Sequence, residues 1–245
     1  MLKEIILAIV QGITEFLPVS SSGHLALISN LISEPNLFFM VAMHLASLLA
    51  ILIYFRKDII NLTKFKDKKN QHYYKIILLG IIPAGIFGYF FSDLINTAIN
   101  SYLFIGTGFL ISTLFLFSSK IKIGKKKNIT LKDSLVIGFA QVLALFPGVS
   151  RSGTTTATGM LRKASPETAG KFSFLMFIPL MIGATILEFQ NFYFSTTLLI
   201  SFLVCFAVSM LSLNLFFKSL KKGYFWIFGI WTLIMGIVSF VLGIF

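Results

Sequence analysis

Long apolar stretches alternate with short polar ones along most of this chain. Six of them approach the roughly 20 residues that a helix needs to cross a bilayer. They predict membrane spans at about 38–55, 75–92, 102–119, 169–189, 194–217 and 224–244. Two other regions, 1–34 and 132–163, each contain two apolar halves around a break rich in Pro, Gly and Ser. Neither half is long enough to cross, so each region predicts a re-entrant helical hairpin whose broken backbone lines a cavity.

The composition agrees with a membrane protein. Hydrophobic residues make up 56% of the 245 positions, with a mean hydropathy of +0.89, against about 45–50% in soluble domains. The single Cys205 excludes a disulfide framework and a cysteine metal site. The N-terminal apolar stretch leads into a Pro/Ser motif without a small-residue cleavage site, so no signal peptide is expected. The net charge of +12 lies mainly in loops and therefore predicts no nucleic-acid partner.

The distribution of basic residues predicts the topology. Nineteen of the 21 lie in four groups, within 56–75, 120–132, 162–171 and 218–222. The positive-inside rule makes these groups cytoplasmic. Counting crossings then places both termini outside, brings the first hairpin in from the outside, and brings the second in from the cytoplasm. We therefore expect a single all-α polytopic domain, residues 1–245. It would be an inverted-topology repeat with halves of about 1–120 and 130–245, each one re-entrant hairpin plus three transmembrane helices.

The two breaks resemble each other and carry the polar residues of interest. One reads PVSSSG from Pro18 and the other PGVSRSG from Pro147, with one extra Gly. Hairpins that enter from opposite faces meet near the midplane. This would bring Glu15, the Ser20–Ser22 run and His24 close to Ser150, Arg151 and Thr155.

Arg151 is the most informative of these residues. An ionisable side chain at membrane depth is costly and usually faces a polar cavity. Guanidinium, hydroxyls and exposed amides together form an anion site, most plausibly for phosphate. The alternative is a buried structural ion pair, but Asp133 and Glu167, the acids nearest in sequence, are expected at the cytoplasmic ends.

The first hairpin supplies the other candidates. Glu15 has Gln11 four positions earlier on the same helical face, and this pair suits a divalent cation, an oriented water or a structural hydrogen bond. His24, beside hydroxyls, suits a nucleophile or a general acid/base. The serines could also be simple helix caps, and His44 is interpreted as a packed or hydrogen-bonded residue.

QGITEFLPVSSSGH and PGVSRSGTTTATG resemble the two signature segments of the bacterial undecaprenyl-diphosphate phosphatases, the bacitracin-resistance type. The resemblance implies an enzyme of the bacterial cytoplasmic membrane that hydrolyses the lipid carrier's diphosphate to its monophosphate. This reaction recycles the carrier for peptidoglycan and other envelope polymers and confers bacitracin resistance. The resemblance also implies an isoprenoid diphosphate substrate, a site open to the outer side, and a divalent cation, Mg or Ca.

By this resemblance the family's residues fall on particular positions of the chain. The family's first acidic pair falls on Gln11 and Glu15, where many members have two glutamates. Glu15 would hold the cation, and the catalytic residues would be Glu15, Ser21, His24 and Arg151. The diphosphate would be bound by Gln11, Ser20, Ser150, Arg151 and Thr155.

Several alternatives stay open at this point. His24 or Ser21 could be the nucleophile, or His24 could activate water. An inverted repeat is also a transporter architecture, so a transporter or flippase for an anionic lipid is the alternative function. SSGH is similar to an element of phosphatidic-acid-type phosphatases, but that family needs a later His, and none follows His72. A homodimer is plausible, and membrane lipids are the other expected partners.

Overall fold

A computed structural model describes residues 1–32, 37–120, 124–188 and 194–244. The ends of the predicted hairpin 1–34 and of the predicted span 169–189 therefore lie outside the described residues. Helices joined by short loops make up the described chain, with one isolated bridge between Lys126 and Ala164. The elements are α1 (Leu2–Thr14), α2 (Ser21–Ile32), α3 (Leu37–Tyr54), α4 (Arg56–Leu62), α5 (Lys68–Phe90), α6 (Ser92–Ile99), α7 (Tyr102–Ser118), α8 (Leu131–Leu143), α9 (Arg151–Leu161), α10 (Pro166–Glu188), α11 (Thr196–Lys222), η1 (Phe225–Ile227) and α12 (Phe228–Ile244).

Several of these helices are able to span a membrane. Within the described ranges, four stretches are long and apolar enough, namely α5, α10, α11 and Phe225–Ile244. The other two predicted spans belong to bent pairs. Helix α3 is followed by α4 across a bend of 76°, and α6 is followed by α7 across a bend of 100°. Counting each pair as one broken span brings the number to six, which agrees with a polytopic membrane protein.

The observed helices extend beyond the predicted spans where polar residues continue them. Helix α5 begins at Lys68 rather than near 75, because the Asp67 side chain caps it by accepting from the Lys69 amide at 2.9 Å. Helix α11 runs to Lys222 and ends at Gly223, whose φ of 73° is the left-handed conformation that glycine adopts without strain. Hydropathy detects only the apolar part of such helices.

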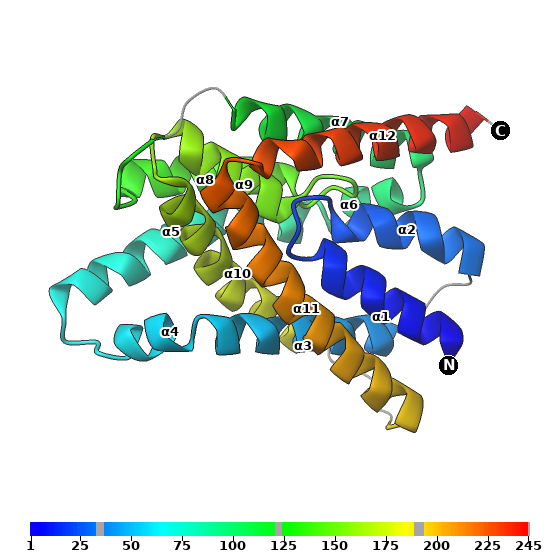
Figure 1. The fold of residues 1–245 in the computed structure, drawn as a ribbon, viewed down its shortest axis with the longest axis horizontal. Helices are drawn as coiled ribbons and strands as arrows, with labels where there is room; N and C mark the ends of the chain where they lie inside the picture. The colour runs from blue at the N-terminus through cyan, green and yellow to red at the C-terminus, as the bar shows by residue number, and fades with distance from the viewer. Residues whose placement is uncertain (33–36, 121–123, 189–193, 245) are drawn as a thin grey trace.

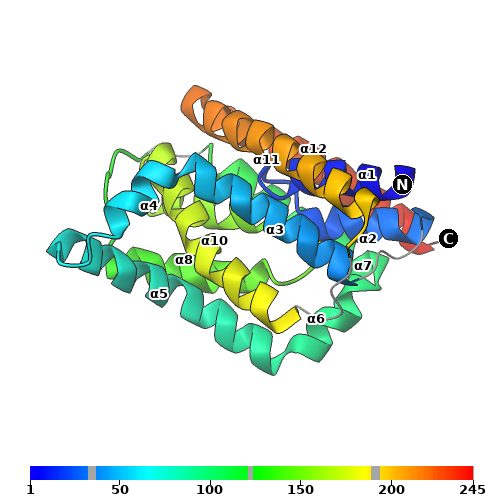
Figure 2. The same ribbon diagram turned by 90° about the horizontal axis from the view of Figure 1, so that it is seen from below.

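The two interrupted regions form helical pairs inside the fold. Helix α1 lies against α2, and α8 lies against α9 (Figure 1). Helix α1 also packs on α11, whereas α8 packs on α5 (Figure 2). Helices α7 and α12 run side by side along one edge. The breaks between the paired helices therefore lie where elements from both parts of the chain converge.

A cluster of aromatic side chains includes Phe16 of the first break and packs it against α10 and α11. Phe16 from the first break meets Phe174 of α10 with ring centroids 5.6 Å apart. Phe174 also meets Phe216 of α11 at 4.8 Å. All three side chains are fully buried. Edge-to-face packing of such rings stabilises a fold beyond the area it buries, so this cluster provides a rigid support for the first break.

A charged cluster anchors the start of α8 far from the breaks. Asp133 is buried and accepts from Arg162 Nε at 3.0 Å, from Lys126, and from the Thr130 amide at 3.0 Å. Thr130 in turn caps the helix through the Asp133 amide, which completes a capping box. Burial raises the pKa of Asp133, but the hydrogen bonds from Lys126, Thr130 and Arg162 outweigh it and hold this pKa at about 2.

Candidate active site

The first break positions Ser20 and Ser21 at the start of α2. Ser20 adopts a φ of 69°, a strained conformation for a residue other than glycine. Its hydroxyl accepts from the Gly23 amide at 3.3 Å, so Ser20 caps the helix. Ser21 is then the first residue of α2. Its hydroxyl donates back across the break to Glu15 Oε2 at 2.7 Å.

The second break repeats this construction. Ser150 caps α9 by accepting from the Gly153 amide at 3.1 Å, and Arg151 is the first residue of the helix. Its turn contains Gly148 with a φ of 86°. The sequence left open whether these serines cap helices. Ser20 and Ser150 both do.

The two breaks are in direct contact. A Cβ added to Gly23 would lie 2.8 Å from the Cα of Gly148 and 2.7 Å from the Phe109 ring, closer than real Cβ atoms approach. The hydroxyl of Ser152 is also 3.5 Å from the carbonyl oxygen of Leu17. Glycine at position 23 therefore lets the two chain segments meet, and the contact between the two breaks expected from the sequence is present.

An ion pair joins the two breaks. Arg151 Nη2 donates to Glu15 Oε1 at 3.2 Å, with the side chains only 14% and 7% exposed. Gln11 Nε2 donates to Glu15 Oε2 at 3.1 Å. The Arg151 guanidinium also lies over the Phe177 ring, 3.5 Å from its centroid. The argument against an ion pair for Arg151 was therefore wrong, because its acidic partner, Glu15, comes from the other break and not from a neighbour in sequence.

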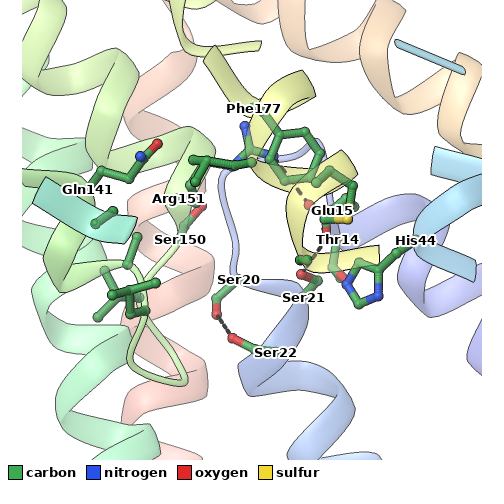
Figure 3. Close-up of a pocket in the computed structure, with 17 residues that line it drawn as sticks. Thr14, Glu15, Ser20, Ser21, Ser22, His44, Gln141, Ser150, Arg151 and Phe177 are labelled. Carbon is green, nitrogen blue, oxygen red and sulfur yellow. Dashed lines mark hydrogen bonds and ion pairs between the residues drawn. The ribbon is translucent and has the colours of Figure 1, made fainter. Parts of the chain in front are cut away.

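These residues border a cavity of about 270 Å³, shown in Figure 3. The size is near the lower end of the roughly 300–1,000 Å³ of small-molecule sites. Among the described residues, Arg151 Nε and Nη1 are buried without a hydrogen-bond partner. The polar lining comes from α1, the two breaks, α2, α3 and α8, and consists of Thr14, Glu15, Ser20, Ser21, Ser22, His44, Gln141, Ser150 and Arg151. A buried cation with unused donors in a partly apolar cavity is suited to an anionic ligand.

Three predicted site residues lie outside this lining. The Trp231 indole donates to His24 Nε2 at 2.9 Å, so His24 Nδ1 carries the hydrogen and donates to the Ser20 carbonyl at 2.7 Å. Both ring nitrogens of His24 are therefore engaged. Thr155 donates to the Arg151 carbonyl at 2.7 Å, and its oxygen is 2.6 Å from the Ser173 hydroxyl. Gln11 lies behind Glu15, fully buried.

Comparison with known proteins identifies the family. The sequence model of the family described as bacitracin resistance protein BacA matches residues 4–238. The chain belongs to the BacA family.

Individual relatives within the BacA family match nearly end to end. The chain is 39% identical to an undecaprenyl-diphosphatase of Thermosipho africanus, over 99% of this chain and 100% of the relative. It is 38% identical to undecaprenyl-diphosphatase 3 of Bacillus cereus, over 96% of each chain. It is also 38% identical to an undecaprenyl-diphosphatase of Methanococcus maripaludis, over 93% of this chain and 94% of the relative.

Two lining residues of this BacA family protein were not predicted from the sequence to belong to the site. His44 of α3 is half-buried and borders the cavity, with Nδ1 3.0 Å from the Met40 carbonyl. Gln141 of α8 borders it from the other side. A signal for Gln141 is present, because it precedes Ser150 by nine positions, as Gln11 precedes Ser20. His44 carries no such signal, since it stands alone in an apolar run.

The residues around the cavity suit a divalent metal cation that is held partly by a phosphate ligand. Within the described ranges, no group of three or more His, Cys, Asp and Glu side chains could hold a metal. Glu15 provides one carboxylate, and beside it Gln11 Oε1 is a buried acceptor without a partner. Magnesium is commonly bound by one or two carboxylates with substrate phosphates and water. A BacA family site with one carboxylate therefore suits a cation that arrives with a phosphate ligand.

Proposed function

We propose that this chain hydrolyses undecaprenyl diphosphate to undecaprenyl phosphate and inorganic phosphate in the bacterial cytoplasmic membrane. The reaction recycles the lipid carrier for peptidoglycan and other envelope polymers and so confers bacitracin resistance. The observation that carries the proposal is the buried Arg151, with two unused donors in a cavity built from both breaks. The names of relatives that align nearly end to end support it. They do not favour the alternative of a transporter or flippase.

Binding of the diphosphate follows from the donors around the cavity. A diphosphate has many acceptor oxygens and several negative charges, which match the guanidinium of Arg151. Ser150 and Ser20 add hydroxyls beside the first turns of α9 and α2, whose amides favour anions. The apolar part of the lining, including Leu180 and Met181, suits the start of an isoprenoid tail. The ligand would therefore be held by its headgroup inside the protein and by its tail near the lipid.

The geometry favours Ser21 over His24 as the nucleophile that attacks the terminal phosphorus. Ser21 lies in the cavity and donates to Glu15 at 2.7 Å, the arrangement of a nucleophile beside a base. Both nitrogens of His24 are occupied elsewhere, so His24 is assigned a positioning role on the first break. In the first step Ser21 Oγ forms a bond to the terminal phosphorus, the bond from that phosphorus to the bridging oxygen breaks, and Glu15 takes up the serine proton. The bridging oxygen leaves on the lipid phosphate. In the second step water attacks the phosphoserine phosphorus, the bond to Ser21 Oγ breaks, the serine regains a proton from Glu15, and inorganic phosphate is released.

A divalent cation, Mg or Ca, would be held by Glu15, with the remaining ligands from phosphate and water. When bound, it would neutralise charge on the phosphate oxygens. The protein's own contribution is to hold this carboxylate beside Arg151, with Glu15 Oε1 3.2 Å from Nη2.

We also infer an inverted repeat with re-entrant hairpins, a cavity open to the outer side and both termini outside. Helix packing supports the repeat, since α1 packs on α11 as α8 packs on α5. The first span of each half also packs on the second span of the other half, α3 on α11 and α10 on α5. Such exchanged contacts are expected of two halves related by a pseudo-two-fold axis.

The proposal is tested by phosphate release from a C55 isoprenyl diphosphate, using purified protein in detergent with and without a chelator. Arg151→Ala should lower kcat/KM by about 10²- to 10³-fold, because donors aimed at developing charge have effects of this size. The matched control is Arg56→Ala, which removes an exposed arginine whose guanidinium donates to the Ile53 carbonyl at 3.1 Å. Wild-type protein that is folded but releases no phosphate with any divalent cation would overturn the proposal.

A further inference from the structure

Gln141 is a polar residue of the cavity lining that takes no part in the proposed reaction as described above. It lies near the C-terminal end of α8 and is 1% exposed. Among the described residues, neither Gln141 Nε2 nor Gln141 Oε1 has a hydrogen-bond partner. Burying an amide without partners costs free energy, and such an exception in a native protein calls for an explanation. Because Gln141 lines the cavity, a ligand is an available partner.

The position of Gln141 relative to Arg151 indicates the kind of ligand. Figure 3 shows Gln141 and Glu15 on opposite sides of Arg151. Glu15 occupies Nη2, whereas Nε and Nη1 of the guanidinium are unpaired. Among the buried side-chain nitrogens of the described lining, those without a hydrogen-bond partner are therefore Nε and Nη1 of Arg151 and the amide nitrogen of Gln141. Phosphate oxygens, which are strong acceptors, match such a set.

Comparison of the two breaks explains why this amide is free. Gln11 precedes Ser20 by nine positions, and Gln141 precedes Ser150 by the same nine. Four positions after Gln11 stands Glu15, which accepts from its amide at 3.1 Å. Four positions after Gln141 stands Leu145, which cannot accept a hydrogen bond. The second break thus keeps the amide without the carboxylate that occupies it in the first.

We propose that Gln141 binds the diphosphate, with its Nε2 donating to a phosphate oxygen on the side of Arg151 that Glu15 does not occupy. This inference rests on the proposed function and deepens it. The headgroup is divided between two subsites, one bordered by Glu15 and Ser21 and the other by Gln141, with Arg151 between them. Gln141 Oε1 then accepts from water or from a protonated phosphate oxygen.

The substitution Gln141→Leu tests this role, because leucine has a similar size and no hydrogen-bonding group. A hydrogen bond to a charged group has a strength that corresponds to about a 10- to 150-fold loss of kcat/KM for the C55 isoprenyl diphosphate. Inhibition by inorganic diphosphate should weaken in parallel. The Tm should stay unchanged or rise, because a buried unsatisfied amide has been replaced by an apolar group. Gln141→Glu, which puts a negative charge beside phosphate, should lose more activity than Gln141→Leu.

The matched control is Gln71→Leu, the same change at an exposed glutamine whose amide donates to the Phe65 carbonyl. It should leave kinetics unchanged. A structural role for Gln141 predicts the reverse pattern, a lowered Tm with an unchanged inhibition constant for inorganic diphosphate, and that result would overturn the inference. Unchanged kinetics and inhibition in Gln141→Leu would overturn it as well.

Failure of the proposed function would be seen separately. If wild-type protein releases no phosphate, calorimetric titration with inorganic diphosphate still compares wild type with Gln141→Leu. Weaker binding by the variant supports Gln141 as an anion ligand whatever the reaction. Equal binding by both proteins contradicts it.

Discussion

The ion pair between Glu15 and Arg151 leads to a prediction for Glu15→Gln. At the observed 3.2 Å, two unit charges attract by about 5 kcal/mol with an effective dielectric constant near 20. The Glu15 side chain is buried and that of Arg151 is 14% exposed, and removing one partner of a buried pair typically costs about 3–5 kcal/mol, because the other charge is left uncompensated. Without an anion, Glu15→Gln should therefore be destabilised by roughly this amount and should lose hydrolysis.

A bound anion should restore part of this stability. In the variant all of the Arg151 nitrogens are free for phosphate, whereas in the wild type Glu15 competes for Nη2. A ligand present at 100 times its Kd stabilises by about 2.7 kcal/mol. With a chelator present, inorganic phosphate should therefore raise the Tm of Glu15→Gln more than that of the wild type. The assay is thermal unfolding in detergent across a phosphate series, with phosphate release measured on the same samples.

The matched control is Glu167→Gln. Glu167 pairs with Lys221 at 3.7 Å, and both side chains are about two-thirds exposed. Such pairs contribute about 0–1 kcal/mol, so this variant should behave like the wild type. The reasoning is refuted if Glu15→Gln is as stable as the wild type without anion and gains no more from phosphate. In that case Arg151 would not depend on Glu15 for compensation of its charge.

Two further predictions concern the contact between the breaks and the anchor of α8. Gly23→Ala should lower stability by about 1–3 kcal/mol and lower phosphate release, because its Cβ would meet Gly148 and Phe109. Gly85→Ala, with nothing within 4 Å of the added Cβ, should not destabilise. Asp133 has a folded pKa of about 2 against an ordinary 3.8. It therefore contributes about 2 kcal/mol above pH 4, which is lost as the pH falls towards 2. Asp133→Asn should flatten the unfolding free energy over this range, and an unchanged slope would contradict the assignment.

Much of this fold follows from hydropathy and from the breaks. The apolar stretches located the spans because a helix in lipid must be apolar over a bilayer's thickness. The short helices α4 and α6 were missed, since their charged or polar first turns, with Asp58 and Asp93, look like loop. The contact between the breaks was foreseen from topology, and Gly23 and Gly148 make it sterically possible.

The site was less accessible to sequence reasoning, because the direction of a side chain depends on partners far along the chain. His24 stands in the same motif as Ser21, yet Trp231, more than two hundred residues later, donates to its ring, and His24 is not among the residues that line the cavity. His44 borders the cavity only because α3 packs beside the first break. Composition and spacing indicate which polar residues could belong to the site, whereas packing decides which of them line the cavity.

The proposed repeat offers a reason for the division of chemistry between the halves. At equivalent positions the breaks share capping serines, Ser20 and Ser150, which provide a common scaffold. They differ at the next position, where one half has Ser21 and the other Arg151. The carboxylate of Glu15 likewise belongs to the first half alone. In the proposed reaction, a symmetric pair of hairpins would thus hold an asymmetric headgroup, because one half would supply the Arg151 guanidinium that binds phosphate and the other the Glu15 carboxylate and Ser21 hydroxyl that act on it.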